Sequence, residues 1–212
     1  MSFFTSSIGR KVVMSITGLF LISFLIVHLA VNLLTLVSKD LFNEASHFMG
    51  TNPFIQTMQY VLALGFILHI SQGLILTMKN RQARPQKYAM NKPETNSGIS
   101  SRSMLLTGVL VLLFIFIHLR DYLWEMKFGN LGGYETDYDL VVGLFDDPIY
   151  TAVYVLSFIL LAFHLNHGFQ SAFQSIGVNH PKYTPFLKTL STVFCVVVGV
   201  GFSAISVYFF FN

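Results

Sequence analysis

The sequence has little charge and a single cysteine. Only 11% of its 212 residues are charged, whereas 53% are hydrophobic and 15% aromatic. Soluble domains carry about 25% charged residues, so this composition excludes an ordinary soluble fold and indicates an integral membrane protein. The mean hydropathy of +0.62 agrees. One cysteine, Cys195, also excludes an intrachain disulfide.

Charged residues are absent or nearly absent from five long segments. These are residues 12–38, 54–78, 103–124, 149–175 and 187–211. About 20 helical residues cross the hydrocarbon core, so each segment is long enough to span a bilayer. The first exceeds the hydrophobic region of a signal peptide and precedes no small-residue cleavage pattern, so we expect it to be retained. The sequence predicts an all-α membrane protein of five transmembrane helices, forming one domain over residues 1–212.

The charged residues are divided unequally between the two sides of the predicted membrane. The N-terminal side carries one acid, Glu94, and most of the basic residues: Arg10, Lys11, Lys79, Arg81, Arg84, Lys87, Lys92, Arg102, Lys182 and Lys188. The positive-inside rule then places the N-terminus in the cytoplasm and the C-terminus outside. Because the pI of 9.0 reflects this topology signal, it requires no nucleic-acid partner.

Four histidines lie inside four different predicted spans, where an ionisable side chain is costly and needs a partner. His28 and His118 lie about 24 Å from the cytoplasmic edge, and His69 and His164 about 15 Å from it, at about 1.5 Å of rise per residue. The depths define two pairs, one above the other. Two imidazoles can occupy both axial positions of a haem iron, as in electron-transfer cytochromes. We therefore predict an outer haem held by His28 and His118, and a cytoplasmic-side haem held by His69 and His164.

An internal repeat accompanies these pairs. Residues 16–29 and 106–119 align without gaps, each with Thr-Gly near the start and His-Leu at the end. Residues 60–73 and 154–168 share Tyr-Val-Leu followed by His-x-x-x-Gly. In this second match, glycine lies one turn after His69 and His164 on the same helix face, where it leaves room for a flat macrocycle. We predict a haem-binding bundle of the first four helices, built from two parallel copies of a helix pair.

Other assignments of the histidines stay open. His167 lies nearly on the face of His164 and is the alternative ligand on that helix. Each intramembrane histidine can instead hydrogen-bond a carbonyl or a hydroxyl of a neighbouring helix. His47 and His180 fall outside the predicted spans and are interpreted as interfacial. Because the chain lacks a Cys-x-x-Cys-His motif, any haem is expected to be non-covalent, of the b type.

The ordered motifs resemble the cytochrome b558-type membrane anchor of succinate:quinone oxidoreductases, the di-haem, single-polypeptide form found in respiratory complex II. The resemblance covers essentially the whole chain. It rests on the sequence around residues 6–18, 27–32, 69–73, 117–121, 139–148 and 163–174. Five spans, with histidines on the first four, also match that family.

This resemblance implies two haems b, bound without covalent links in a bacterial cytoplasmic membrane. It implies a flavoprotein and an iron–sulfur subunit docked on the cytoplasmic side. Electrons from succinate would reach first the haem of His69 and His164, then that of His28 and His118, and then a quinone, typically menaquinone. The chain would carry no dicarboxylate site of its own.

Two kinds of polar residue are expected to serve these cofactors. Haem propionates are anionic and bind cations, so Arg120 is a candidate partner on the outer side. The cytoplasmic candidates are Arg10, Lys11, Lys79 and Lys188. No acid falls deep within a predicted span, so quinone protonation is expected to use surface acids such as Glu44, Asp121 or Glu125. The quinone-site residues themselves stay unassigned.

Three other functions fit parts of this pattern. A cytochrome b anchor of another respiratory complex, such as the nitrate-reductase type, also uses five helices and four histidines. A transporter could use the histidines as a proton relay, although it would favour intramembrane acids. A membrane di-iron enzyme would gather its histidines near one surface. The histidines lie at two depths in the predicted membrane, and the motifs occur in the expected order. Both observations favour the succinate-type anchor.

Overall fold

The computed structural model describes residues 6–82 and 99–212, and long helices dominate it. Five helical stretches are long and apolar enough to cross a membrane. They are α1 (Ser7–Leu33) with the short η2 (Leu34–Leu36), α3 (Pro53–Gln82), α5 (Ile99–His118) continuing through the π-helix η3 (Leu119–Trp124) and α6 (Glu125–Lys127), α8 (Pro148–Ser175), and α9 (Thr184–Phe211). The prediction of an all-α membrane protein with five spans is confirmed. Arg84, Lys87, Lys92 and Glu94 lie outside the described residues.

Side-chain caps set where two of these helices begin. The hydroxyl of Ser6 accepts a hydrogen bond from Gly9 N at 3.0 Å, so α1 starts several residues before the predicted residue 12. Asp147 caps α8 by accepting from Ile149 N at 2.7 Å, with Pro148 in the first turn, where its missing N–H costs nothing. Arg10 and Lys11 therefore lie inside α1. A helix end tolerates such charges near a membrane surface, because long basic side chains can extend to the water.

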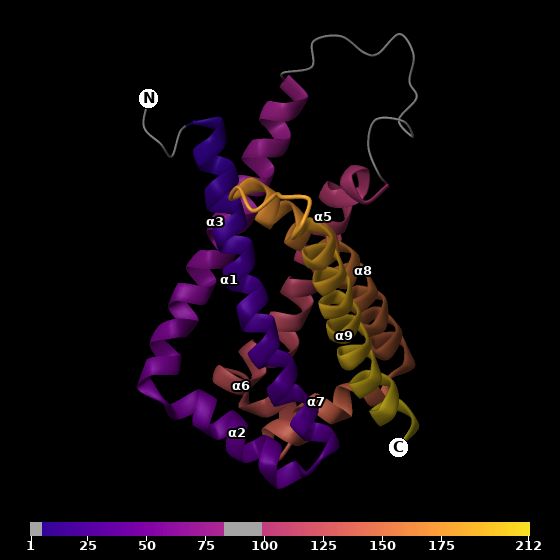
Figure 1. Ribbon diagram of the computed structural model, residues 1–212. Helices are drawn as coiled ribbons and strands as arrows, with labels where there is room; N and C mark the ends of the chain where they lie inside the picture. Colours follow the sequence, from indigo (N-terminus) through magenta and orange to yellow (C-terminus); the bar gives the residue numbers. More distant parts are fainter. Residues whose placement is uncertain (1–5, 83–98) are drawn as a thin grey trace.

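The spans pack as a bundle in which α1 and α8 are central. The α1 helix packs against α3, α8 and α9, while α8 also packs against α5 and α9. Figure 1 shows α3 on one side of α1 and the α8/α9 pair on the other. Two glycines allow the close approach of α9: a Cβ on Gly199 would lie 3.0 Å from Ala162 Cβ, and one on Gly201 3.0 Å from Leu29 Cδ1. Although α9 carries none of the four histidines, it joins α8 to α1.

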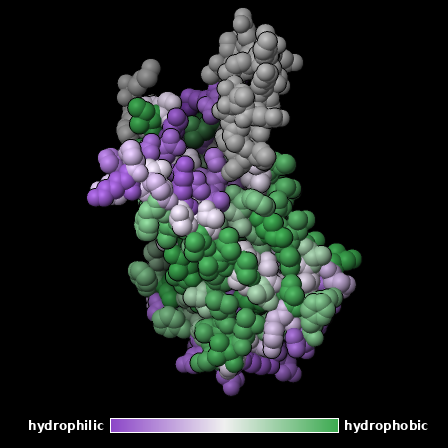
Figure 2. All heavy atoms as spheres, turned by 45° about the vertical axis from the view of Figure 1, so that its right-hand side comes forward, coloured by the Kyte–Doolittle hydropathy of each residue, from purple (hydrophilic) through white to green (hydrophobic). Residues whose placement is uncertain are grey.

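The outer surface of the bundle is apolar in its middle. Figure 2 shows hydrophobic side chains covering the central part of the molecule, with hydrophilic residues gathered toward both ends. Large apolar side chains on different spans are well exposed, among them Phe116 at 63% and Val200 at 61%. Water makes such a surface costly, whereas lipid chains make it favourable. The exposure therefore fits a multi-pass membrane protein.

Short helices close the end of the bundle opposite the N-terminus. This end, here called the α2/α7 end, contains α2 (Lys39–Thr51), η4 (Asn130–Gly133), α7 (Asp137–Gly143) and η5 (Leu144–Asp146) (Figure 1). Lys39 Nζ lies 2.7 Å from Asp139 Oδ1, Ser46 donates to Asp137 at 2.5 Å, and Asn43 Oδ1 accepts from Tyr138 N at 3.0 Å. These contacts hold together two connecting segments, the one between α1 and α3 and the one between α5 and α8.

The Lys39–Asp139 pair predicts a pH-dependent contact between α2 and α7. The hydrogen bond from Lys39, with a second from Thr136, lowers the pKa of Asp139, and the bond to Asp139 raises the pKa of Lys39. The carboxylate then stabilises the fold above its unfolded pKa of about 4, and this contribution is lost as the pH falls through the lowered native value. The lysine contribution is full below about pH 10 and is lost as the pH rises through the raised native value.

We expect the protection factors for hydrogen exchange in residues 39–51, which correct for the intrinsic pH dependence of amide exchange, to be high at pH 7 and to fall in acid as Asp139 is protonated. Asp139→Asn should lower these protection factors already at pH 7 and make them respond less to acid. Because both side chains are partly exposed, at 44% and 27%, added salt should weaken the effect. An identical acid response in parent and variant would contradict the prediction.

Candidate functional site

The rings of His28 and His118 meet near the α2/α7 end. His28 comes from α1 and His118 from the last residue of α5, and their ring centroids lie 5.7 Å apart with planes at 85°. Aromatic rings surround the pair: Phe24 and Phe202 lie beside His28, while Phe114, Tyr122 and Tyr154 lie beside His118. Phe202 belongs to α9, so the fifth span contributes to this site without supplying a histidine.

His69 and His164 meet nearer the N-terminal end. Their ring centroids lie 6.5 Å apart with planes at 80°, and they come from α3 and α8. His167 is partly buried one turn further along α8. His47 and His180 are exposed. The structure therefore brings together the two pairs that their depths in the sequence predict.

Each pair joins helices that face one another across the bundle. The packed neighbours are α1 with α3, α1 with α8, and α8 with α5. The histidine pairs instead link α1 to α5 and α3 to α8. The paired side chains come from facing helices and meet at the centre of the bundle, which is the place where helical bundles can bind cofactors.

The spacing of both pairs fits one iron between two imidazoles. An imidazole nitrogen binds a metal at about 2 Å, and the ring centroid lies about 1 Å behind that nitrogen, so axial ligands have centroids about 6 Å apart. The observed values are 5.7 and 6.5 Å. Axial ligation leaves the angle between the two ring planes free.

Buried polar atoms near both pairs also fit a bound polar group. Within the described residues, four such atoms lack a hydrogen-bond partner: Arg10 Nη1, Gln72 Oε1, His118 Nδ1 and Tyr122 Oη. His118 belongs to one pair, and the Tyr122 ring packs edge-on against it, with ring centroids 5.1 Å apart. Gln72 lies one turn from His69 on α3, and Arg10 lies near the start of α1. Unpartnered buried polar atoms are uncommon in native proteins and call for an explanation.

Hydroxyl groups contact the second pair of histidines. Thr17 Oγ1 lies 3.3 Å from His69 Nδ1, and Thr107 Oγ1 lies 3.5 Å from His164 Nδ1. The sequence repeat aligns the two threonines with each other but does not indicate these contacts. Gly73 and Gly168, which the sequence singled out, face other side chains: a Cβ there would lie 3.5 Å from Met14 Cε and 3.7 Å from Met104 Cε.

Asp121 corrects one expectation from the sequence. It was interpreted as a surface acid, yet it is 2% exposed and its side chain is fully buried. Its Oδ2 accepts from the Tyr154 hydroxyl at 2.9 Å, and its Oδ1 accepts from Arg120 Nη1 at 2.9 Å. The π-helix η3 alters the register directly after His118 and is the segment that carries Asp121. Glu44 is exposed and stays at the surface.

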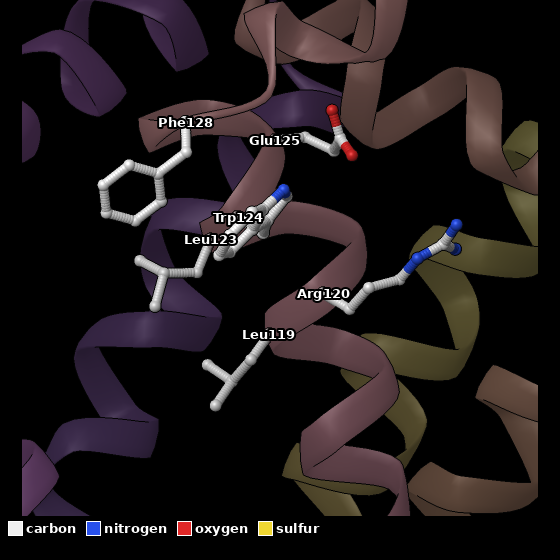
Figure 3. Close-up of a pocket in the computed structure, with 6 residues that line it drawn as sticks. All are labelled: Leu119, Arg120, Leu123, Trp124, Glu125 and Phe128. Atoms are coloured by element: carbon white, nitrogen blue, oxygen red, sulfur yellow. The ribbon is translucent and has the colours of Figure 1, made fainter.

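A mostly apolar hollow lies along η3. Its volume is about 540 Å³, and Leu119, Arg120, Leu123, Trp124, Glu125 and Phe128 line it. Figure 3 shows Leu119, Leu123 and Phe128 on one side of this helix and Arg120 and Glu125 on the other. Arg120 is paired with Asp121 and also donates to the Tyr150 hydroxyl at 3.3 Å. Its side chain is 70% exposed, so its other N–H groups face outward.

Comparison with known proteins identifies related membrane subunits. The family described as the succinate dehydrogenase/fumarate reductase transmembrane subunit matches residues 77–201. The chain is 26% identical over 183 residues to the succinate dehydrogenase cytochrome b558 subunit of Bacillus subtilis (strain 168), covering 85% of this chain and 83% of that protein. No solved structure matches the chain significantly.

Proposed function

The chain belongs to the succinate dehydrogenase/fumarate reductase transmembrane subunit family, and from that premise we propose that it is a membrane anchor and di-haem b electron-transfer subunit of succinate:quinone oxidoreductase. The observation that carries the proposal is the pair of cross-bundle histidine contacts, 5.7 and 6.5 Å between ring centroids. The Bacillus subtilis relative is named a cytochrome b558 subunit, which supports haem as the bound group.

Within this proposal, His28 and His118 bind one haem iron, and His69 and His164 bind the other. A haem held by two of these histidines would supply one-electron transfer and would have no open position for activating oxygen. The aromatic rings around His28 and His118 keep that site apolar and exclude water. The unpartnered Arg10 Nη1 suits a propionate on the N-terminal side. The exposed donors of Arg120 suit one at the α2/α7 end.

The proposed orientation follows the basic residues at the N-terminal end. That end faces the cytoplasm of a bacterial cell and receives the flavoprotein and iron–sulfur subunits, while the α2/α7 end and the C-terminus face outward. We propose that the dicarboxylate site lies on those partner subunits rather than on this chain. Electrons thus move between the cytoplasmic iron–sulfur subunit and a membrane quinone, proposed to be menaquinone.

The hollow along η3 is the proposed place for the quinone near the outer pair. It begins one residue after His118, and its lining is largely apolar. Arg120 and Glu125 supply polar groups at its edge. A lipid-soluble ring with carbonyl oxygens needs this combination of apolar contact and a few polar partners.

A difference spectrum of the purified complex tests the proposed function. We expect a dithionite-reduced-minus-oxidised spectrum of a b-type cytochrome, and a pyridine haemochrome assay giving two haems per chain. Co-purification of flavoprotein and iron–sulfur subunits with succinate activity would distinguish it from an anchor of the nitrate-reductase type. A preparation that lacks haem would refute the proposal and leave a transporter as the better account.

A further inference from the structure

The Thr-Gly dipeptides at residues 17–18 and 107–108 make nearly identical contacts with two histidines. Thr17 Oγ1 lies 3.3 Å from His69 Nδ1, and Thr107 Oγ1 lies 3.5 Å from His164 Nδ1. A Cβ on Gly18 would lie 3.3 Å from His69 Cε1, and a Cβ on Gly108 would lie 3.3 Å from His164 Cε1. Each dipeptide thus contacts the same edge of an imidazole that comes from a neighbouring helix.

The hydrogen-bond direction follows from where each hydroxyl proton goes. Thr17 Oγ1 donates to its own helix, to Val13 O at 2.8 Å or Met14 O at 3.1 Å. Thr107 Oγ1 does the same with Ser103 O at 3.1 Å or Met104 O at 3.2 Å. A hydroxyl has one proton and two lone pairs. With the proton used along the helix, the hydroxyl offers the histidine a lone pair, and the tautomer that matches this lone pair carries its hydrogen on Nδ1.

We propose that Thr17-Gly18 and Thr107-Gly108 are positioning residues that hold His69 and His164 as Nδ1–H tautomers, with Nε2 free to bind iron. This inference rests on the proposed haem function. The hydroxyl accepts the Nδ1 hydrogen, and the missing side chain of the glycine admits the ring edge. Ligating histidines usually donate their second N–H to such a partner, which fixes the ring orientation and raises the basicity of the ligand.

The pair near the α2/α7 end lacks this arrangement within the described residues. His118 Nδ1 is buried without a hydrogen-bond partner. The surroundings of His28 and His118 are instead aromatic rings. A change at Thr17 or Thr107 should therefore affect one haem and leave the other unchanged.

Thr17→Val and Thr107→Val, alone and together, test the proposal in the intact complex. A more basic ligand stabilises ferric iron, so removing the hydroxyl should raise the reduction potential of one haem in a redox titration. The double variant should shift that haem further and weaken its retention by about 10-fold. Thr17→Ser and Thr107→Ser keep the hydroxyl and should restore the parent potential.

Thr77→Val is the matched control. Thr77 lies on α3 and donates to Gly73 O at 2.8 Å, the same bond to the residue four positions earlier, and within the described residues its hydroxyl makes no hydrogen bond to a histidine. It should leave both potentials unchanged. Equal shifts in Thr77→Val and Thr17→Val, no shift in the double variant, or haem loss that serine does not reverse would each overturn the proposal. A parent complex without haem would instead refute the proposed function, so the two failures are distinguishable.

Discussion

Replacing His164 with alanine is expected to leave the complex with about half of the parent's haem b, because one axial ligand of one iron is removed. His28→Ala, His69→Ala and His118→Ala should each have the same effect on haem content. The pyridine haemochrome assay per chain measures the loss. A redox titration of the same samples identifies which of the two haems is missing.

Because the histidines are paired, the same experiment also tests which two histidines bind the same haem, in addition to the number of haems per chain. His69→Ala and His164→Ala should remove the same redox component, because their rings face each other at 6.5 Å. His28→Ala and His118→Ala should remove the other component, since their rings meet at 5.7 Å. Different components lost within one pair would contradict the proposed ligation.

The matched control for this series is His167→Ala. His167 lies on the same helix as His164 and is also partly buried, so the substitution has a similar effect on packing. It should retain both haems. Haem loss in His167→Ala together with full retention in His164→Ala would transfer the ligand role to His167, the alternative that the sequence left open.

The five spans could be predicted because membrane insertion depends mainly on the length and hydropathy of local segments. Their ends were less predictable because side-chain caps and tolerated charges set them. Ser6 starts α1 early, and Lys79 and Arg81 still belong to the last turn of α3. The α2 helix went unnoticed because it lies outside any apolar run. Its position depends on partners about 90 to 100 residues away, such as Asp137 and Asp139.

The histidine pairs could be predicted because depth along a helix follows directly from residue count. Their surroundings could not, because they depend on how helices rotate and pack. Nothing in the local sequence of Phe202 indicates that it lies beside His28. The contact between Thr17 and His69 likewise joins residues 52 positions apart. The repeat marked Thr-Gly as matched positions without showing what they touch, and the two-copy architecture stays a proposal that these equivalent contacts support.

Asp121 shows how a single change of helix type defeats an estimate of exposure. Counted along a regular helix, it falls near the membrane surface, beyond His118. The π-helix η3 adds residues to the turn there, and the carboxylate is buried against Tyr154, which is itself 1% exposed. A buried carboxylate is tolerated only when its oxygens are hydrogen-bonded. Both oxygens of Asp121 have such partners.

Asp121→Ala is therefore expected to destabilise the protein by about 3 kcal/mol, since it leaves the buried Tyr154 hydroxyl without its acceptor and removes a buried hydrogen-bonded network. Tyr154→Phe should cost less, about 1 to 2 kcal/mol, because it removes one bond and leaves the contact with Arg120. Thermal unfolding in detergent, followed by circular dichroism, measures both.

Asp139→Ala is the control, because its carboxylate also binds a cation but lies at the surface with 27% of its side chain exposed. Exposed pairs contribute little, so its midpoint should stay close to that of the parent. If Asp121→Ala unfolds no earlier than Asp139→Ala, the buried network does not stabilise this end of the bundle. If it unfolds earlier, the haem ligated by His118 should be the first to dissociate on heating, because Asp121 holds the turn that directly follows that ligand.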